Sequence, residues 1–494
     1  MEVGKSSIIR CLDLLLGKNM QQLYSSISDS DFKNKEFPFS IEIRLTDFND
    51  NELSFFPDEI DPSDGNSLTV RLEATLDEEE GLLIRRYCPK TDSSLKPKQF
   101  QSIRCRWNMI PPDLSIKSLD SRRKTIVDNY LEEIDTSDSG AELSNAVNSL
   151  CKAIDESVAF SNALRSLVSE LDPMLNGGVK DDSLRFVPGA AIDGNLLSDV
   201  RLQIKSQSGT MREVTEQSDG TKSLIAFAIY DLLNPEGLIA IDEPEIHLHP
   251  SAQRNLIKIL KGTNRQLIIA THSGIVAGEF NPDDIAVTRD DRIVQPEQGF
   301  LQDNQKTLAR WWISNRIELL TSKSIIAVEG QSDRMILARV AELTNRHLER
   351  DDVEILEAGG CNEMKHVMRI FGEQGFRLHV SILVDGDAEK KMADELGVEK
   401  NNLSSKSIFV SRTDLEDEYV SAIGANRLWD AFYTSSMFTP NQLSNFKSDA
   451  SNSKELTRLC RKYKIASAVI ACNLLDPASA SSVSSIVEVL DDVL

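Results

Sequence analysis

The chain has 494 residues and a formal net charge of −23 at pH 7; 40% of its residues are hydrophobic and 27% are charged. This length predicts two or three domains with ample hydrophobic core. The sequence contains no apolar run of about 18 residues, so we expect no membrane span. The negative charge argues against a protein that coats DNA, so a DNA-acting role requires local basic surface and metal ions. Seven cysteines without a C-x-x-C pair, and no visible signal peptide, predict reduced thiols in the cytoplasm.

The first motif is Gly4-Lys5-Ser6-Ser7, which opens an apolar helical pattern. It matches the second half of a phosphate-binding loop, G-x-x-x-x-G-K-[ST]. In such a loop, backbone N–H groups hold phosphates, Lys5 reaches the terminal phosphates and Ser6 ligates Mg²⁺. The first glycine of the motif and its preceding strand would lie before residue 1, so we expect weak ATP binding.

The next segments predict an antiparallel layer followed by a helical insertion. Residues 39–46, 67–75 and 81–87 alternate apolar and polar side chains and predict strands, and we expect a further strand at 100–107. The spacing then becomes helical over about 113–175, which predicts either an inserted arm or a plain helical subdomain. The basic cluster 122–124 in this segment is either a solvated helix face or a DNA contact.

A second candidate phosphate contact stands at Gln217–Ser223, where the next helix begins. Ser218 and Gly220 at a helix start are suited to meet a γ-phosphate presented by another subunit. An ordinary N-cap turn explains the same residues.

Two buried strands follow, each with a polar end. The apolar run that begins at Leu238 ends in Asp242 and Glu243, at the edge of a sheet where α/β proteins bind ligands. In an NTPase such carboxylates hold Mg²⁺ (Asp242) and polarise water (Glu243), although a strand that ends in a polar turn shows the same pair. The second strand, from Gln266, leads to His272, which is either a γ-phosphate sensor or a structural residue.

The last third of the chain contains an acidic pattern on alternating strands and helices. Buried strands end at Glu329 and at Asp385 and Asp387, and Asp333 begins the helix after the first of them. We expect parallel strands that collect these acids at one edge, with Asp385 and Asp387 on one face because alternate strand residues share a face. A group of carboxylates without His or Cys predicts a site for two Mg²⁺ or Mn²⁺ ions. Such ions activate the water that hydrolyses a phosphodiester. The alternative is a flavodoxin-like sheet with acidic loop ends.

These motifs resemble known families. The order Lys5, Ser218, Asp242-Glu243, His272 resembles ABC-type ATPases of the SMC/RecF branch, and Asp-Glu-Pro-Glu followed by His-Leu-His-Pro resembles the OLD family. The Glu-Gly-x-x-Asp and Asp-x-Asp elements resemble the TOPRIM domain. In OLD-type TOPRIM domains an acid and a lysine follow, and Glu416 and Lys464 match them best, with Asp414 and Asp417 as other acids; solvated surface residues are the alternative.

The resemblance implies an α/β protein with three parts. These are an ABC-type (RecF/SMC-like) ATPase head at 1–320 with a helical insertion at about 113–175, a Rossmann-like parallel-sheet TOPRIM domain at 321–440, and a C-terminal helical segment at 441–494. The implied ATP-site residues are Gly4, Lys5, Ser6, Ser7, Ser218, Gly220, Asp242, Glu243 and His272, and the implied TOPRIM metal ligands are Glu329, Asp333, Asp385 and Asp387.

The OLD family, which includes the nuclease subunit of the Gabija antiphage system, implies a metal-dependent DNA endonuclease. It further implies nucleotide control, a homodimer or larger assembly, and a role in phage defence, with a regulatory protein or nucleic acid as a further partner. The alternative is a nucleotide-switched DNA-binding or scaffold protein of RecF type with an inactive TOPRIM domain.

Overall fold

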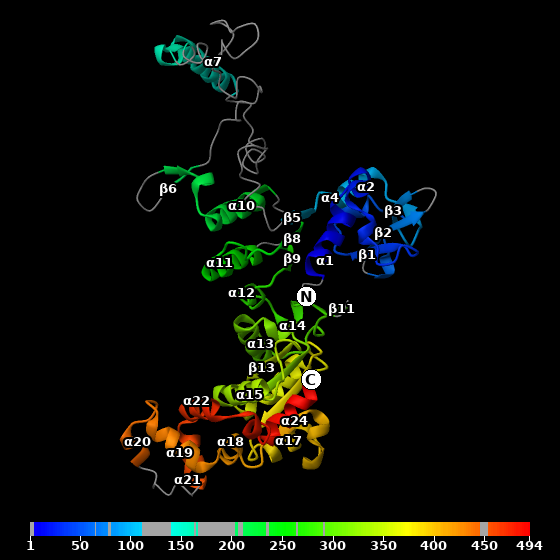
Figure 1. The fold of residues 1–494 in the computed structure, drawn as a ribbon. Helices are drawn as coiled ribbons and strands as arrows, with labels where there is room; N and C mark the ends of the chain where they lie inside the picture. The colour runs from blue at the N-terminus through cyan, green and yellow to red at the C-terminus, as the bar shows by residue number, and fades with distance from the viewer. Residues whose placement is uncertain are drawn as a thin grey trace. The chain divides into compact units, whose positions relative to one another are not determined.

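The computed structural model describes residues 4–64, 66–77, 81–110, 140–162, 165, 203–205, 211–233, 237–262, 265–289, 292–444 and 453–494 (Figure 1). The chain forms two compact units. Ser6–Thr271 is called the head unit, and Met1–Lys5 with His272–Leu494 the C-terminal unit. In the described part of the chain no helix is long and apolar enough to cross a membrane.

The head unit contains the predicted antiparallel layer. Strands β1 (Phe39–Leu45), β2 (Leu68–Asp77), β3 (Gly81–Cys88) and β4 (Ser93–Ser94) pair in that order, all antiparallel. Alternate residues of β2 from Leu68 to Ala74 are buried. They share a core with helices α1 (Lys5–Leu12), η1 (Asp13–Gly17) and α2 (Met20–Ser26). The three strands predicted at 39–87 are therefore confirmed.

The strand predicted at 100–107 is wrong. Residues Pro97–Arg104 form helix α4, and strand β5 begins only at Trp107 and ends at Ile110. Pro97 lies in the first turn, where its missing N–H costs nothing. The Gln99 side chain accepts the N–H of Lys96 at 3.0 Å. Pro97 and the side chain of Gln99 start a helix before residue 100, so the apolar side chains that follow lie on a helix and not on a strand.

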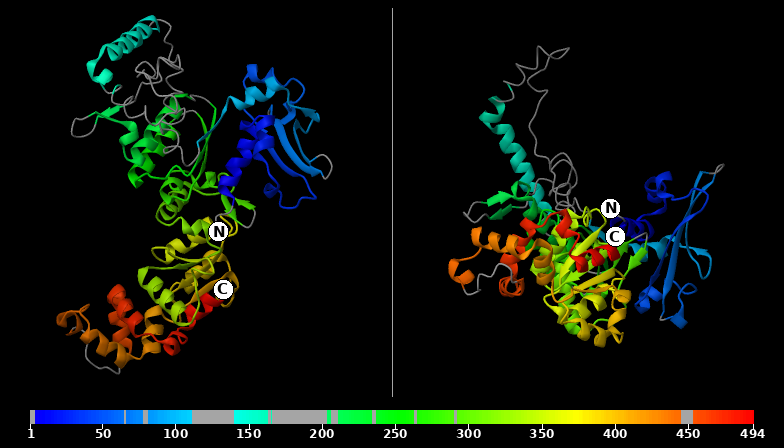
Figure 2. Two further views of the ribbon diagram at one scale, coloured as in Figure 1. Left: turned by 45° about the horizontal axis from the view of Figure 1, so that its top comes forward. Right: turned by 60° about the horizontal axis from the view of Figure 1, so that its bottom comes forward.

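A parallel sheet forms the centre of the head unit. Strands β5, β8 (Leu238–Asp242) and β9 (Gln266–Ala270) pair in parallel with β8 in the middle. Helices α10 (Asp219–Leu233) and α11 (Pro250–Lys261) lie on one face and α1 on the other (Figures 1 and 2). Residues 239–241 are almost fully buried, so the prediction of β8 as a buried central strand is confirmed.

The segment predicted as a helical insertion is described in part. Helix α7 (Gly140–Glu156) confirms one of its helices. It is followed by the hairpin β6 (Gln203–Lys205) and β7 (Met211–Glu213) and by η4 (Val214–Glu216). The first predicted helix and the basic cluster 122–124 lie outside the described residues.

The C-terminal unit is built on a second parallel sheet. Strands β12 (Ser324–Val328), β13 (Val353–Glu357), β14 (His379–Val384) and β15 (Ile408–Val410) lie in the order β13-β12-β14-β15 and are all parallel. This order is that of a Rossmann-like sheet, in which β13 is added on one side of β12 and the later strands β14 and β15 are added on the other side. Two of these strands, β12 and β14, are the buried strands that the sequence predicts before Glu329 and Asp385.

Helices cover both faces of this sheet (Figure 2). Ile326 and Val328 of β12 point into one core and Ile325 and Ala327 into the other. The first core is completed by α15 (Gln331–Leu343), α18 (Leu415–Ile423), α19 (Ala425–Thr434), α20 (Pro440–Ser444), α21 (Ser453–Lys462), α22 (Lys464–Leu474), α23 (Pro477–Ala480) and α24 (Ser484–Val493). The second is completed by α13 (Asp303–Asn315), α14 (Glu318–Thr321), α16 (Met364–Phe371) and α17 (Glu389–Leu396).

Residues 285–288 and 292–294 have the apolar pattern of two short strands, and the structure forms the hairpin β10 (Val287–Arg289) and β11 (Arg292–Val294) there. The amphipathic pattern from Leu308 to Leu320 predicts one helix, but the structure forms two, α13 and α14, because the backbone leaves the helical region at Arg316. Its two tryptophans separate as an amphipathic helix requires: Trp312 is 2% exposed and Trp311 60%.

Candidate metal and nucleotide sites

Acidic side chains meet at the carboxyl edge of the C-terminal sheet. Glu329 directly follows β12 and Asp385 directly follows the neighbouring parallel strand β14. The backbone amide of Asp385 lies close enough to the Glu329 carboxylate to lower its pKa, although burial raises that pKa overall. Asp333, in the first turn of α15, is buried and accepts the N–H of Gly330 at 2.9 Å. The structure thus brings these three predicted residues together.

Asp387 differs from the expectation. Strand β14 ends at Val384 and a turn follows at 386–388, so the argument that alternate strand residues share a face does not apply to Asp385 and Asp387. Asp387 is exposed, whereas Asp385 is partly buried. The negative charge of Asp387 nonetheless acts on Glu329, so Asp387 lies at the rim of the acidic group.

The predicted late acid and lysine join the same group. Glu416 lies in the first turn of α18 and is 2% exposed, and its Oε1 lies 3.4 Å from Nζ of Lys464, the first residue of α22. The neighbouring N–H of Leu415 donates to Oδ1 of Asp385 at 3.1 Å. Of the three acids left open by the sequence, Glu416 is therefore the one that contacts Lys464. We call Glu329, Asp333, Asp385, Asp387, Glu416 and Lys464 the acidic cluster.

The acidic cluster is electrostatically strained. Burial raises the pKa of Glu329, Asp333 and Glu416 above the usual range for carboxyl groups. Burial, together with the charges of Glu329 and Glu416, raises the pKa of Asp385 to about 7. For Lys464, burial lowers the pKa, but the surrounding carboxylates outweigh it and the net pKa is raised. One lysine does not neutralise several carboxylates, so the cluster favours either protons or further cations.

The donor set fits divalent cations. Carboxylate oxygens are the ligands that Mg²⁺ and Mn²⁺ prefer, and Oε2 of Glu416 is buried without a hydrogen-bond partner. Within the described ranges, no three His, Cys, Asp or Glu side chains already surround a common metal position. The ligands are thus grouped by the fold but not preset in a coordination geometry.

Two residues beside the cluster escaped the sequence analysis. Arg461 forms an ion pair with Asp414, the N-cap of α18. The second is Cys361. Burial is the main cause that raises the pKa of its thiol, and the nearby charges of Glu329 and Asp387 raise it further. Only tertiary folding brings these residues to the site, so the sequence offered no spacing signal for either.

The predicted nucleotide-site residues lie in both units. In the head unit, Ser6 Oγ donates to Oδ1 of Asp242 at 3.1 Å, and Asp242 is buried. Glu243 has a positive φ of 51° and its N–H donates to the carbonyl of Ala270 at 2.8 Å. The two predicted Mg²⁺ ligands of the head, Ser6 and Asp242, are therefore adjacent.

The first residues of the chain belong to the C-terminal unit. There, Nζ of Lys5 lies 3.4 Å from Nδ1 of His272, so the predicted phosphate lysine and γ-phosphate sensor are neighbours. Gly4 has a positive φ of 98°, which suits a glycine in a tight loop. Ser7 is exposed on α1.

Ser218 and Gly220 stand at the start of α10. Ser218 Oγ accepts the backbone N–H of Thr221 at 3.4 Å, as in the N-cap alternative. Gly220 packs so closely that a Cβ there would lie 2.7 Å from the carbonyl oxygen of His247, in the turn after β8. Only glycine fits at this position without displacing that turn.

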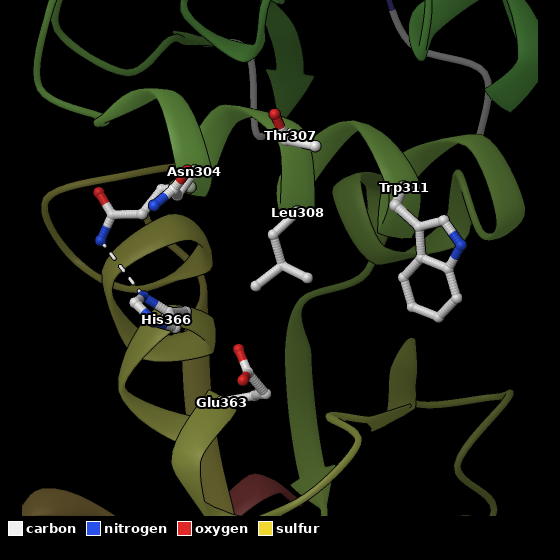
Figure 3. Close-up of a pocket in the computed structure, with 7 residues that line it drawn as sticks. Asn304, Thr307, Leu308, Trp311, Glu363 and His366 are labelled. Atoms are coloured by element: carbon white, nitrogen blue, oxygen red, sulfur yellow. Dashed lines mark hydrogen bonds between the residues drawn. The ribbon is translucent and has the colours of Figure 1, made fainter.

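A separate cavity of about 410 Å³ lies between α13 and α16 (Figure 3). Trp311 and Leu308 form its apolar wall, and Nε2 of Gln305 lies 3.4 Å from Nδ1 of His366 on the polar side. The carboxylate of Glu363 also lines it. None of the predicted site residues does.

Two family models match the chain. Residues 3–277 match the family described as "AAA domain, putative AbiEii toxin, Type IV TA system", which covers more than half of the chain. The chain belongs to this family. Residues 320–387 match the TOPRIM domain of proteins like the overcoming lysogenization defect (OLD) protein. The predicted combination of an ATPase-type head and an OLD-like TOPRIM domain is therefore confirmed, together with the α/β fold class.

The curated relatives of the chain are distant. It is 25% identical over 218 residues to the OLD nuclease of Thermus scotoductus, covering 40% of this chain and 41% of the relative. It is 26% identical over 201 residues to the Old nuclease of Escherichia phage P2, covering 36% and 34%. A third relative is the Retron Ec83 probable ATPase of Escherichia coli, 27% identical over 28% of each chain. The alignments span less than half of each relative's length.

Solved structures with partial similarity include the C-terminal region of the Burkholderia pseudomallei OLD protein, at 20% identity and a TM-score of 0.29, covering 35% of this chain and 96% of that one. The SMC head domain from Thermotoga maritima is 15% identical with a TM-score of 0.27, covering 60% and 86%. Similarity at this level carries no functional argument.

Proposed function

We propose that this OLD-type chain is a metal-dependent endonuclease that nicks or cleaves DNA under the control of its ATPase-type head. The observation that carries the proposal is the acidic cluster, in which buried carboxylates outnumber the one lysine they contact. A folded protein maintains such a group at a cost, because like charges are held together in a partly buried place. Perturbed carboxyl groups at the carboxyl edge of a parallel sheet are a common mark of an active site.

The residues of the cluster have distinct roles in this proposal. Glu329, Asp333, Asp385 and Glu416 would hold divalent cations, and Asp387 would complete the set from the rim. When bound, such ions supply an activated water and neutralise charge on a phosphodiester. The amino group of Lys464, whose side chain is 42% exposed, can reach a phosphate while Glu416 orients it. The rest of the work is holding the phosphate in line with the attacking water.

The proposed role of the head is nucleotide binding. Support comes from Ser6 and Asp242, which pair a hydroxyl with a carboxylate as the Mg²⁺ ligands of a phosphate-loop ATPase do. In this proposal Lys5 and His272 contact the terminal phosphates, Glu243 polarises water, and Ser218 and Gly220 act on the nucleotide of a second subunit. A homodimer, a cytoplasmic role in antiphage defence and a regulatory partner follow from the family resemblance and belong to the same proposal.

The deciding experiment is plasmid nicking by the purified chain with Mg²⁺ or Mn²⁺. We expect metal-dependent conversion of supercoiled to open-circular or linear DNA, and a loss of more than about 100-fold in Asp385→Asn, because even residues that only support metal ligands are worth 10–100-fold. Asp394→Asn is the matched control, since Asp394 is an exposed carboxylate on α17 of the same unit.

Three outcomes separate the readings. Nicking that survives in Asp385→Asn contradicts the assignment of the site or reveals a contaminating nuclease. Wild-type protein that neither nicks DNA nor binds Mn²⁺ in calorimetry contradicts the proposal and favours the RecF-type scaffold. Tight Mn²⁺ binding that is lost in Asp385→Asn, without nicking, retains the metal site and directs the search to a missing activator.

A further inference from the structure

Asp414 and Arg461 form an ion pair beside the acidic cluster. Asp414 is 8% exposed and precedes α18, where its Oδ1 accepts the N–H of Asp417 at 2.8 Å and caps the helix. Its Oδ2 accepts a hydrogen bond from Nε of Arg461, near the end of α21. The pair therefore joins the first residue before α18 to the end of a helix that lies 47 residues later in the chain.

This ion pair lies next to both functional contacts of α18. Immediately after Asp414, the N–H of Leu415 binds Asp385, and the carboxylate of Glu416 contacts Lys464. Lys464 follows Arg461 by only three residues and begins α22. Two parallel links, Asp414–Arg461 and Glu416–Lys464, thus connect the start of α18 to the junction of α21 and α22.

The two links differ in rigidity. A lysine has a flexible stem and a point charge, whereas the planar guanidinium of arginine binds a carboxylate in a defined orientation. Asp414 is also held by the helix cap, so the Asp414–Arg461 link is the stiffer one. Arg461 is 45% exposed, and an ion pair with such an exposed partner contributes little to global stability. The Asp414–Arg461 ion pair therefore matters for where it holds α18 and α21, and not for global stability.

We infer that Asp414 and Arg461 are a positioning pair that holds Glu416 and Lys464 in register with Asp385. The inference rests on the proposed function, because it assigns the pair a task in the metal site. Without Arg461, the junction of α21 and α22 is free to shift against α18. Lys464 and Glu416 then lose their fixed separation, and Glu416 is no longer held in the orientation that the proposed metal site requires.

The test compares Arg461→Ala with Arg427→Ala. Arg427, whose side chain is 49% exposed, pairs at 3.0 Å with Asp476, which caps α23, so this control breaks another arginine–N-cap pair of the same unit that contacts no member of the acidic cluster. We expect Arg461→Ala to weaken Mn²⁺ binding and nicking about 10–100-fold, the usual effect of losing support for a metal ligand. Arg427→Ala should leave both unchanged, and Arg461→Lys should recover part of the loss.

Two further variants separate positioning from helix capping. Asp414→Asn keeps a cap acceptor but removes the charge, so it should reproduce the effect of Arg461→Ala. The double variant should be no worse than the more damaging single one, because both remove the same link. Losses that add fully in the double variant would overturn the inference.

Hydrogen exchange at the Leu415 amide gives a readout that needs neither metal nor DNA. We expect faster exchange in Arg461→Ala than in wild-type protein or Arg427→Ala, since the Leu415–Asp385 hydrogen bond loses its support. Unchanged exchange together with wild-type Mn²⁺ affinity in Arg461→Ala would overturn the positioning role alone. Wild-type protein that binds no Mn²⁺ and cuts no DNA, yet shows the exchange difference, would contradict the proposed function and retain the pair as the device that positions α18.

Discussion

The two candidate sites of the molecule hold their buried carboxylates in different surroundings. In the head unit, the buried Asp242 accepts a hydrogen bond from the hydroxyl of Ser6. In the C-terminal unit, Oε2 of the buried Glu416 has no partner and the pKa of Asp385 is raised to about 7. The carboxylate of the head has a neutral donor from the chain, whereas the acidic cluster has one lysine for several carboxylates and favours added protons or cations.

This difference teaches where cations matter most. A carboxylate satisfied by a neutral donor gains modestly from a metal ion, because it already has a hydrogen bond. Several carboxylates in one partly buried group gain more, because each charge raises the cost of ionising the next. We therefore expect the C-terminal unit to bind divalent metal without nucleotide, and the head to bind metal mainly together with a nucleotide.

Among the tests of this contrast, the largest effect is expected from replacing Lys464, the only ion-paired cation of the acidic cluster among the described residues. Lys464→Met should reduce nicking about 100-fold, as loss of one charged group that stabilises a transition state typically does. Mn²⁺ affinity should change less, because a lysine competes with a metal for the same carboxylates. Nicking rates and calorimetry measured on one preparation check the divergence.

The matched control for this change is Lys462→Ala. Lys462 is exposed in the same segment and lies over the ring of Tyr463 rather than against a carboxylate of the cluster. Equal losses in the two variants would mean that general positive charge, not the Lys464–Glu416 contact, accounts for the activity.

Much of the acidic cluster was accessible from the sequence because it follows simple rules. Buried parallel strands end in a common edge, so an apolar run followed by an acid predicts the places of Glu329 and Asp385. The turn that separates Asp387 from β14 was not accessible, since Val-Asp-Gly-Asp is compatible with a longer strand. Sequence reasoning also kept three late acids open, because burial of Glu416 depends on helices far away in the chain.

The missed features share a physical cause. The pairing of Arg461 with Asp414 depends on how α21 packs on α18, which no local pattern encodes. Helix α4 was mistaken for a strand because its apolar residues are few, and the decisive signals, Pro97 and the Gln99 cap, lie before them. The sequence predicts elements and their ends well where burial is uniform, and poorly where tertiary contacts choose among polar residues.

The next effect is a pH dependence of metal binding. Because the pKa of Asp385 is about 7, a proton competes with the metal below that pH, and Mn²⁺ affinity should fall by up to about tenfold per pH unit for each proton displaced. The raised pKa also means that ionised Asp385 opposes folding, so metal-free protein should lose stability as pH rises through 7. Added Mg²⁺ should therefore raise the melting temperature more at pH 8 than at pH 6.

Asp385→Asn provides the control for the pH dependence, because it removes the group with the highest raised carboxyl pKa while keeping its size. The difference between the Mg²⁺ shifts at pH 8 and pH 6 should shrink in this variant. An unchanged difference would show that other groups of the chain control the pH dependence, and the contrast between the two units would lose its electrostatic basis.

The smallest expected effect tests the head. Ser6→Ala removes the donor to Asp242 and leaves a buried carboxylate oxygen without that hydrogen bond, which should cost about 1–3 kcal/mol of unfolding free energy. Ser25→Ala, at an exposed position on α2 of the same unit, should cost less than about 0.5 kcal/mol. Denaturant unfolding measures both, and binding of a fluorescent ATP analogue with Mg²⁺ should weaken only in Ser6→Ala. If the two serine variants behave alike, the Ser6–Asp242 hydrogen bond does not stabilise the head. The contrast between Asp242 and the carboxylates of the acidic cluster would then not hold.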